Sequence, residues 1–126
     1  MKIIYIGFGG FLGAVVRYVI ARFFNQFVVS FPLGTFVVNV VGSLILGFFL
    51  YAVNFGKTVS PNFRDFLAIG FIGAFTTMST FAYESFRLFE TKEFFYFSLN
   101  VFITIFSCLT AIFIGREIAL IITTTK

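Results

Sequence analysis

Long apolar runs, separated by short polar links, fill almost the whole chain. About 20 consecutive apolar residues are enough to cross a bilayer as a helix, and the 126 residues hold four such runs. Only 11% of the residues are charged, whereas soluble domains carry about 25%, so this chain cannot cover itself with a surface compatible with water. The sequence therefore predicts an all-α membrane protein with four transmembrane helices in the lipid bilayer.

The predicted helices form a single domain, residues 1–126, and cover about residues 3–24, 32–54, 63–89 and 93–121. The cations lie mostly at helix ends, which is typical of anchoring at the membrane interface, so the net charge of +4 does not indicate a nucleic-acid partner. Gly9 and Gly13 form a pattern of small residues that permits close packing of helices. Pro32 fits the first turn of the second helix.

The third apolar run contains hydroxyl groups where an ordinary transmembrane helix carries Leu and Val. Gly73 precedes Thr76, Thr77, Ser79 and Thr80, and Ser and Thr side chains compete for backbone hydrogen bonds. Polar or non-helical backbone at membrane depth occurs only where it is buried in protein or lines a wet cavity. The sequence therefore predicts that this third helix is broken in the middle of the membrane, beside an ion site or a permeation path.

Polar residues also share one face of the second helix, at Thr35, Asn39 and Ser43. Asn39 carries two amide donors and no formal charge, which suits transient coordination of an anion. The alternative is that Asn39 only links helices by hydrogen bonds, and its position alone does not decide between the two roles.

The fourth helix carries a similar polar face. Its members are Asn100, Thr104 and either Ser107 or Cys108. Met78 and Phe81 follow the predicted break and project from one face of the third helix, where the positive edge of an aromatic ring could contact an anion. Together with the hydroxyl groups of the third helix, the two polar faces indicate a hydrated path.

Few charged residues lie inside the predicted helices. Arg17 either extends to the membrane interface or raises the local anion concentration in an aqueous vestibule. Glu84 and Arg87 are three residues apart, which predicts an ion pair on the helix surface. The first two helices contain no Asp or Glu, and the chain has no His and one Cys. A carboxylate proton relay and an enzyme active site are therefore not expected.

Lys and Arg residues are divided between the two sides of the membrane. One side carries Lys2, Lys57, Arg64 and Lys126, and the other carries Arg22, Arg87 and Lys92. The Lys/Arg bias that normally fixes orientation is therefore weak. Either the chain inserts in both orientations and two copies pair in antiparallel fashion, or other factors fix one topology; the charges alone leave both open.

Three motifs, taken together, resemble the Fluc (CrcB) fluoride channels, and they follow one another along the whole chain. They are Gly9-Gly10-x-x-Gly13-Ala14-x-x-Arg17-Tyr18, Gly34-Thr35-x-x-x-Asn39-x-x-Gly42-Ser43 and Gly73-x-x-Thr76-Thr77-x-Ser79-Thr80-Phe81. The resemblance implies a dual-topology antiparallel homodimer with two pores, which exports fluoride passively across a bacterial or archaeal plasma membrane. It also implies a central structural Na⁺ at the dimer interface, held by backbone carbonyls at Gly73 and Thr76.

The resemblance further implies a set of residues along the fluoride path. They are Arg17, Asn39, Met78, Phe81, Asn100, Thr104 and either Ser107 or Cys108. From the residues themselves, the hydroxyl groups of Thr35, Thr77, Ser79 and Thr80 are expected on the same path. Met78 departs from the family pattern, because the family has a phenylalanine there. A methionine has a polarizable thioether but no positive ring edge.

Two other functions remain as alternatives. A small multidrug-resistance-type proton-coupled antiporter also has four helices and dual topology, but it needs a carboxylate in its first helix, and this chain has none there. A membrane assembly factor that transports nothing, held together by its Gly and Ser faces, is the third possibility.

Overall fold

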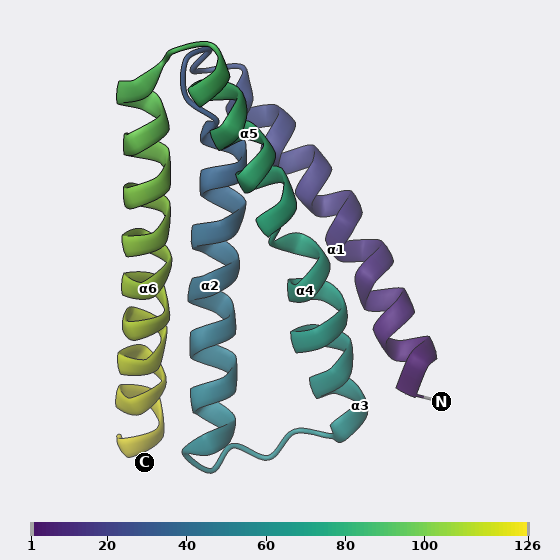
Figure 1. Cartoon of the computed structure of the whole chain (residues 1–126). Coiled ribbons are helices and arrows are strands. Elements are labelled where there is room, and N and C mark those ends of the chain that lie inside the picture. Colours follow the sequence, from purple (N-terminus) through teal and green to yellow (C-terminus); the bar gives the residue numbers. More distant parts are fainter. Residues whose placement is uncertain (1, 126) are drawn as a thin grey trace.

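The computed structural model describes residues 2–125 and shows an all-helical chain (Figure 1). The elements in order are α1 (Lys2–Asn25), α2 (Leu33–Asn54), α3 (Pro61–Arg64), η1 (Asp65–Ile72), α4 (Gly73–Phe75), α5 (Met78–Glu90) and α6 (Phe94–Thr124). Within residues 2–125, four stretches are long and apolar enough to cross a membrane: α1, α2, the third helical segment Pro61–Glu90, and α6. This confirms the predicted all-α chain with four membrane-spanning helices.

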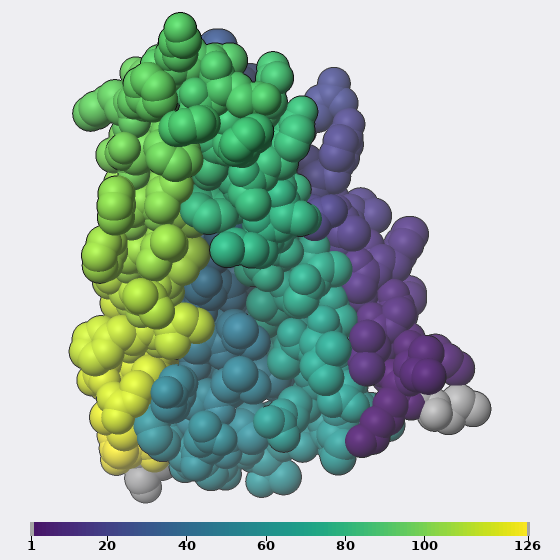
Figure 2. All heavy atoms as spheres, viewed as in Figure 1, coloured from purple at the N-terminus to yellow at the C-terminus, as the bar shows by residue number. Residues whose placement is uncertain are grey.

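The helices pack mainly as two pairs: α2 with α6, and α1 with the first half of the third segment. α2 runs beside α6 along most of its length, while α1 packs against η1 and α4 (Figure 1). The space-filling view shows α2 recessed between α6 and the region of α4 and α5 (Figure 2). The third segment therefore begins against α1 and ends against α6, with α2 behind its middle.

Glycines bring α1 and η1 into backbone contact. A Cβ atom at Gly9 would collide with the carbonyl oxygen of Phe66, and one at Gly13 would collide with the backbone of Phe71. From the other side, a Cβ atom at Gly70 would lie 2.6 Å from the carbonyl oxygen of Ile6. The close packing predicted from Gly9 and Gly13 is thus confirmed. Its main partner is the third segment.

The α2–α6 pair uses glycine in the same way. A Cβ atom at Gly47 would lie 2.7 Å from the carbonyl oxygen of Ile112, and one at Gly115 would lie 2.5 Å from that of Leu44. Without side chains at these positions the two backbones approach closely, and dispersion contacts along the seam replace the hydrophobic drive that lipid cannot supply.

Two details of the helices differ from the sequence prediction. The eight residues of η1 form a π-helix, which hydropathy does not reveal because it reports polarity and not hydrogen-bond register. Pro32 lies at the N-cap position, and α2 begins one residue later than predicted, at Leu33. The backbone N–H of Gly34 donates to Asn25 Oδ1 at 2.8 Å, so a side chain at the end of α1 satisfies an orphan donor of α2.

Substitution of two glycines in α1 should separate packing from helix propensity. Gly13→Ala should lower stability by about 1–3 kcal/mol, because the added methyl meets backbone atoms that cannot rotate away. Gly7 has no atom within 4 Å of the position of an added Cβ, so Gly7→Ala should keep the stability of the parent or raise it by up to about 1 kcal/mol, the gain in helix propensity. Thermal unfolding of the purified protein in detergent measures both changes. Equal melting temperatures for the two variants would contradict the α1–η1 contact.

Candidate functional site

The third segment is interrupted at two threonines. Thr76 has φ −84° and ψ 156°, and Thr77 has φ −151° and ψ 113°, which are extended conformations. Gly73 is still helical, with φ −59° and ψ −34°, and α5 resumes at Met78. The break predicted for this stretch therefore falls on hydroxyl residues, three positions after the glycine.

The side chain of Asn39 bridges this interruption from α2. Its Oδ1 accepts from the backbone N–H of Thr77 at 2.8 Å, and its Nδ2 donates to the carbonyl oxygen of Thr77 at 3.2 Å. Asn39 is 8% exposed, so both bonds are shielded from water. The amide thus acts like a neighbouring strand of backbone and satisfies the two groups of Thr77 that the helix no longer pairs.

The side chain of Thr77 begins the second half of the segment. Its Oγ1 accepts from the backbone N–H of Thr80 at 3.2 Å and thereby caps α5. The same hydroxyl donates to Thr80 Oγ1 at 3.1 Å. Threonine is among the favoured N-cap residues because its oxygen satisfies one of the orphan N–H groups of a helix start.

Among the carbonyl groups at the interruption, those of Gly73 and Thr76 lose their helical donors through these contacts. In a continuous α-helix the N–H of Thr77 would donate to Gly73, and that of Thr80 would donate to Thr76. Here the first donates to Asn39 and the second to the side chain of Thr77. The carbonyls of Gly73 and Thr76, the two residues that the sequence resemblance assigns to Na⁺, have therefore both lost their helical donors.

Two cavities meet at the interruption, and Thr77 lines both. The Met78 cavity, of about 350 Å³, is lined by Asn39, Ser43, Thr76, Thr77, Met78, Phe81, Thr104, Ile105, Cys108 and Leu109. The Arg17 cavity, of about 370 Å³, is lined by Arg17, Tyr18, Ala21, Arg22, Asn25, Thr35, Val38, Thr77, Thr80 and Glu84. Most of the residues that the sequence assigned to an ion path thus surround these two hollows.

Three of the predicted path residues lie elsewhere. Asn100 is 1% exposed; its Nδ2 donates to Ser85 Oγ at 2.8 Å, and its Oδ1 accepts from Thr104 Oγ1 at 3.2 Å. Ser107 is half-buried and Ser79 is exposed, and neither lines the two cavities. Of the two alternatives on α6, Cys108 is therefore the one that reaches the Met78 cavity.

Ser85 is a site residue that sequence reasoning missed. Its hydroxyl accepts from Asn100 and donates to the carbonyl oxygen of Phe81 at 2.7 Å. This chain of bonds ties α6 to the turn of α5 that carries Phe81. A serine one turn after Phe81 was the available signal, because it places a hydroxyl within reach of that carbonyl.

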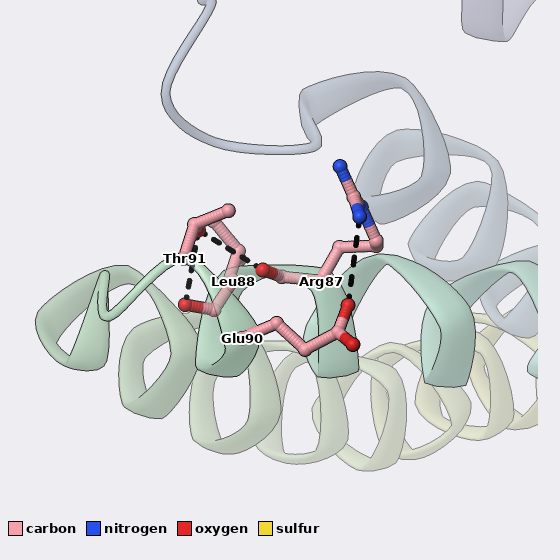
Figure 3. A network of polar contacts seen from close by, with 4 residues as sticks. All are labelled: Arg87, Leu88, Glu90 and Thr91. Atoms are coloured by element: carbon pink, nitrogen blue, oxygen red, sulfur yellow. Dashed lines mark hydrogen bonds and ion pairs between the residues drawn. The ribbon is translucent and has the colours of Figure 1, made fainter.

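The predicted ion pair between Glu84 and Arg87 is wrong. Glu84 turns toward α2, where its Oε1 accepts from Thr35 Oγ1 at 2.9 Å. Its Oε2 is buried and has no hydrogen-bond partner within the part of the chain that the structure describes. Arg87 instead pairs with Glu90 at 3.5 Å, beside the bonds from Thr91 to the carbonyls of Arg87 and Leu88 (Figure 3).

Four membrane-spanning helices and an interrupted, hydrogen-bonded third segment define an integral multi-pass membrane protein with a polar site between its helices. The model of the family described as "CrcB-like protein, Camphor Resistance (CrcB)" matches residues 4–116. This chain belongs to the CrcB family, as the sequence motifs indicated. The family is one of ion channels and not of enzymes. This confirms the prediction that the protein is not an enzyme.

Curated relatives from both archaea and bacteria are similar over nearly the full length. "Fluoride-specific ion channel FluC 1" of Methanosarcina acetivorans is 44% identical over 94% of this chain and 90% of its own. "Fluoride-specific ion channel FluC" of Methanococcus aeolicus is 43% identical over 96% of this chain and 97% of its own. A protein of the same name from Campylobacter jejuni is 44% identical over 87% and 90%.

Two substitutions of Thr77 should test the cap. Thr77→Val removes the hydroxyl that accepts from Thr80 and should cost about 1 kcal/mol of stability, whereas Thr77→Ser keeps an acceptor and should cost less. Thermal unfolding in detergent measures both. If valine and serine have the same effect, the hydroxyl does not hold the start of α5.

Proposed function

We propose that this protein is a fluoride-selective channel that lets fluoride leave the cell passively across a bacterial or archaeal plasma membrane. The observation that carries the proposal is the interruption at Thr76 and Thr77, which lies between two cavities and is surrounded by uncharged donors. The names of the relatives support the choice of ion. We place the interruption in the middle of the membrane, because it lies halfway along Pro61–Glu90, a stretch that is long and apolar enough to cross a bilayer.

Fluoride is small and strongly hydrated, so donors along the route must offset the loss of its water. The Nδ2 group of Asn39 has two N–H bonds; one donates to Thr77, and the other is available to an ion in the Met78 cavity. Thr80 Oγ1 accepts from Thr77, which leaves its own O–H for the Arg17 cavity. Such neutral donors bind an anion without holding it, as conduction requires.

Two further groups suit an anion path. Phe81 lines the Met78 cavity, and the edge of its ring carries partial positive charge. Arg17 and Arg22 line the other cavity together with Glu84, so this mouth has an excess of positive charge. A positive mouth raises the local concentration of anions and the rate at which they enter.

The active form is proposed to be an antiparallel homodimer of dual topology with two pores. A single chain leaves both cavities open, and Gly73 and Met78 are exposed beside the interruption. A second copy would close these hollows and cover the released carbonyls. Labelling of cysteines introduced at the termini, from each side of the membrane, should find both orientations. A single orientation would reject the antiparallel dimer.

We also propose a structural Na⁺ at the dimer interface, held by the carbonyls of Gly73 and Thr76. These groups fit the ion, because both have lost their helical donors and carbonyls of broken helices coordinate Na⁺ in membrane transporters. No group of three acidic, His or Cys residues able to bind a metal occurs among residues 2–125, which favours neutral carbonyl ligands. When bound, the ion would add a fixed positive charge close to the path.

Exchange of Na⁺ for a large organic cation such as N-methylglucamine tests the ion site. The melting temperature of the parent protein and of Thr77→Ser should fall. Asn39→Leu removes both bonds to the backbone of Thr77 and should let the helix close over these carbonyls, so its melting temperature should no longer depend on Na⁺. A parent protein that is indifferent to Na⁺ would rule the site out.

Anion efflux from liposomes that contain the purified protein tests the function itself. Fluoride should leave rapidly once a counter-ion path is opened, chloride should be retained, and a proton gradient should not be needed. Absent fluoride flux, or equal chloride flux, would refute the channel. Efflux that requires a proton gradient would instead favour the proton-coupled antiporter.

A further inference from the structure

Two residues that carry sulfur, Met78 and Cys108, line one cavity. Cys108 is the chain's single cysteine, and Met78 is its single methionine after the first residue. They come from different elements, Met78 from the first position of α5 and Cys108 from the middle of α6. Cys108 is a free thiol, and both residues line the Met78 cavity.

From this pair we infer that the Met78 cavity is a binding site for a soft monovalent metal ion such as Ag⁺ or Cu⁺. Thiolate and thioether sulfur are the ligands that select such ions over harder ones. Two ligands are enough for either ion, and the cavity offers one thiol, from Cys108, and one thioether, from Met78. A zinc ion, by contrast, is almost always bound by four N, S or O ligands.

The charge of the cavity also favours this class of ion. Every residue that lines it is uncharged, so a divalent cation would enter without compensation, which is costly in an apolar setting. Binding of Ag⁺ breaks the S–H bond of Cys108, forms an S–Ag bond and releases one proton to solvent, with no change of oxidation state. The resulting silver thiolate is neutral and matches the walls around it.

Occupancy of this site should also stop ion flow. Asn39 and Phe81 line the same cavity, so a metal ion held there fills the space beside the proposed fluoride donor. The proposed metal site depends only on Met78 and Cys108, whereas the proposed block of ion flow also depends on the proposed channel function. The two parts are therefore measured separately.

Binding is measured first, on the purified protein in detergent and chloride-free nitrate buffer, with Ag⁺ as the probe. The parent should bind one Ag⁺ per chain and release one proton per ion. Cys108→Ser should bind none. Loss of a group that only supports a metal ligand costs about tenfold to a hundredfold in affinity, so Met78→Leu, which removes a ligand and keeps the volume, should weaken binding at least about tenfold.

A displaced thiol provides the matched control. Ser107 precedes Cys108 on α6 and does not line the cavity, so the double variant Ser107→Cys with Cys108→Ser keeps one thiol but moves it out of the site. The affinity of this double variant for Ag⁺ should be no higher than that of Met78→Leu. Parental affinity in either of these two proteins would show an ordinary cysteine adduct and overturn the two-sulfur site. Melting temperatures near that of the parent confirm that the variants are folded.

Block is then measured as fluoride efflux from liposomes with Ag⁺ added outside, each variant being compared with its own rate without metal. The parent should lose most of its flux and regain it when thiosulfate removes the metal, and Cys108→Ser should be resistant. If one Ag⁺ binds per chain but the fluoride flux is unchanged, the proposed block is refuted and the proposed metal site is retained. No fluoride flux even without Ag⁺ would refute the proposed function, while the binding result would still stand.

Discussion

The pair of hydrogen bonds between Asn39 and the backbone of Thr77 is the interaction on which the rest of the site depends. An extended peptide unit inside an apolar bundle has an unpaired N–H and an unpaired carbonyl, and each costs several kcal/mol in a membrane. One amide side chain satisfies both. Without it, the helix would be expected to close, and the carbonyls of Gly73 and Thr76 would return to their normal partners. The interruption is thus maintained from α2 as much as from its own sequence.

Backbone contacts between helices determine where this interaction can form. Glycines at 9, 13 and 70 let η1 lie directly on α1, and those at 47 and 115 do the same for α2 and α6. Gly42 belongs to the same system, because a Cβ atom there would collide with the methyl group of Thr76. Gly42 lies one turn after Asn39 on α2, so the close contact at Gly42 accompanies the hydrogen bonds of Asn39 to Thr77.

The sequence predicts the number of helices, the glycine contact of α1 and the stretch that leaves the helix. These properties follow from hydropathy, from residue size and from hydroxyl groups that compete for backbone bonds. It does not predict the π-helix of η1, because a shift of hydrogen-bond register leaves no trace in polarity. It also misplaces the partner of Glu84: spacing along one helix suggests Arg87, but Glu84 accepts from Thr35 on α2 and Arg87 pairs with Glu90. Asn100 matches the periodicity of a lining residue, yet its bond to Ser85 draws it inside.

The two halves of the third segment are attached to different neighbours. η1 and α4 lie on α1 (Figure 1), whereas α5 is tied to α6 by the hydrogen bond between Ser85 and Asn100. Thr76 and Thr77 therefore join two stretches of the segment that pack mainly on different neighbours. A displacement of one stretch relative to the other would change the backbone angles at these two residues, and both cavities that Thr77 lines would change shape with it.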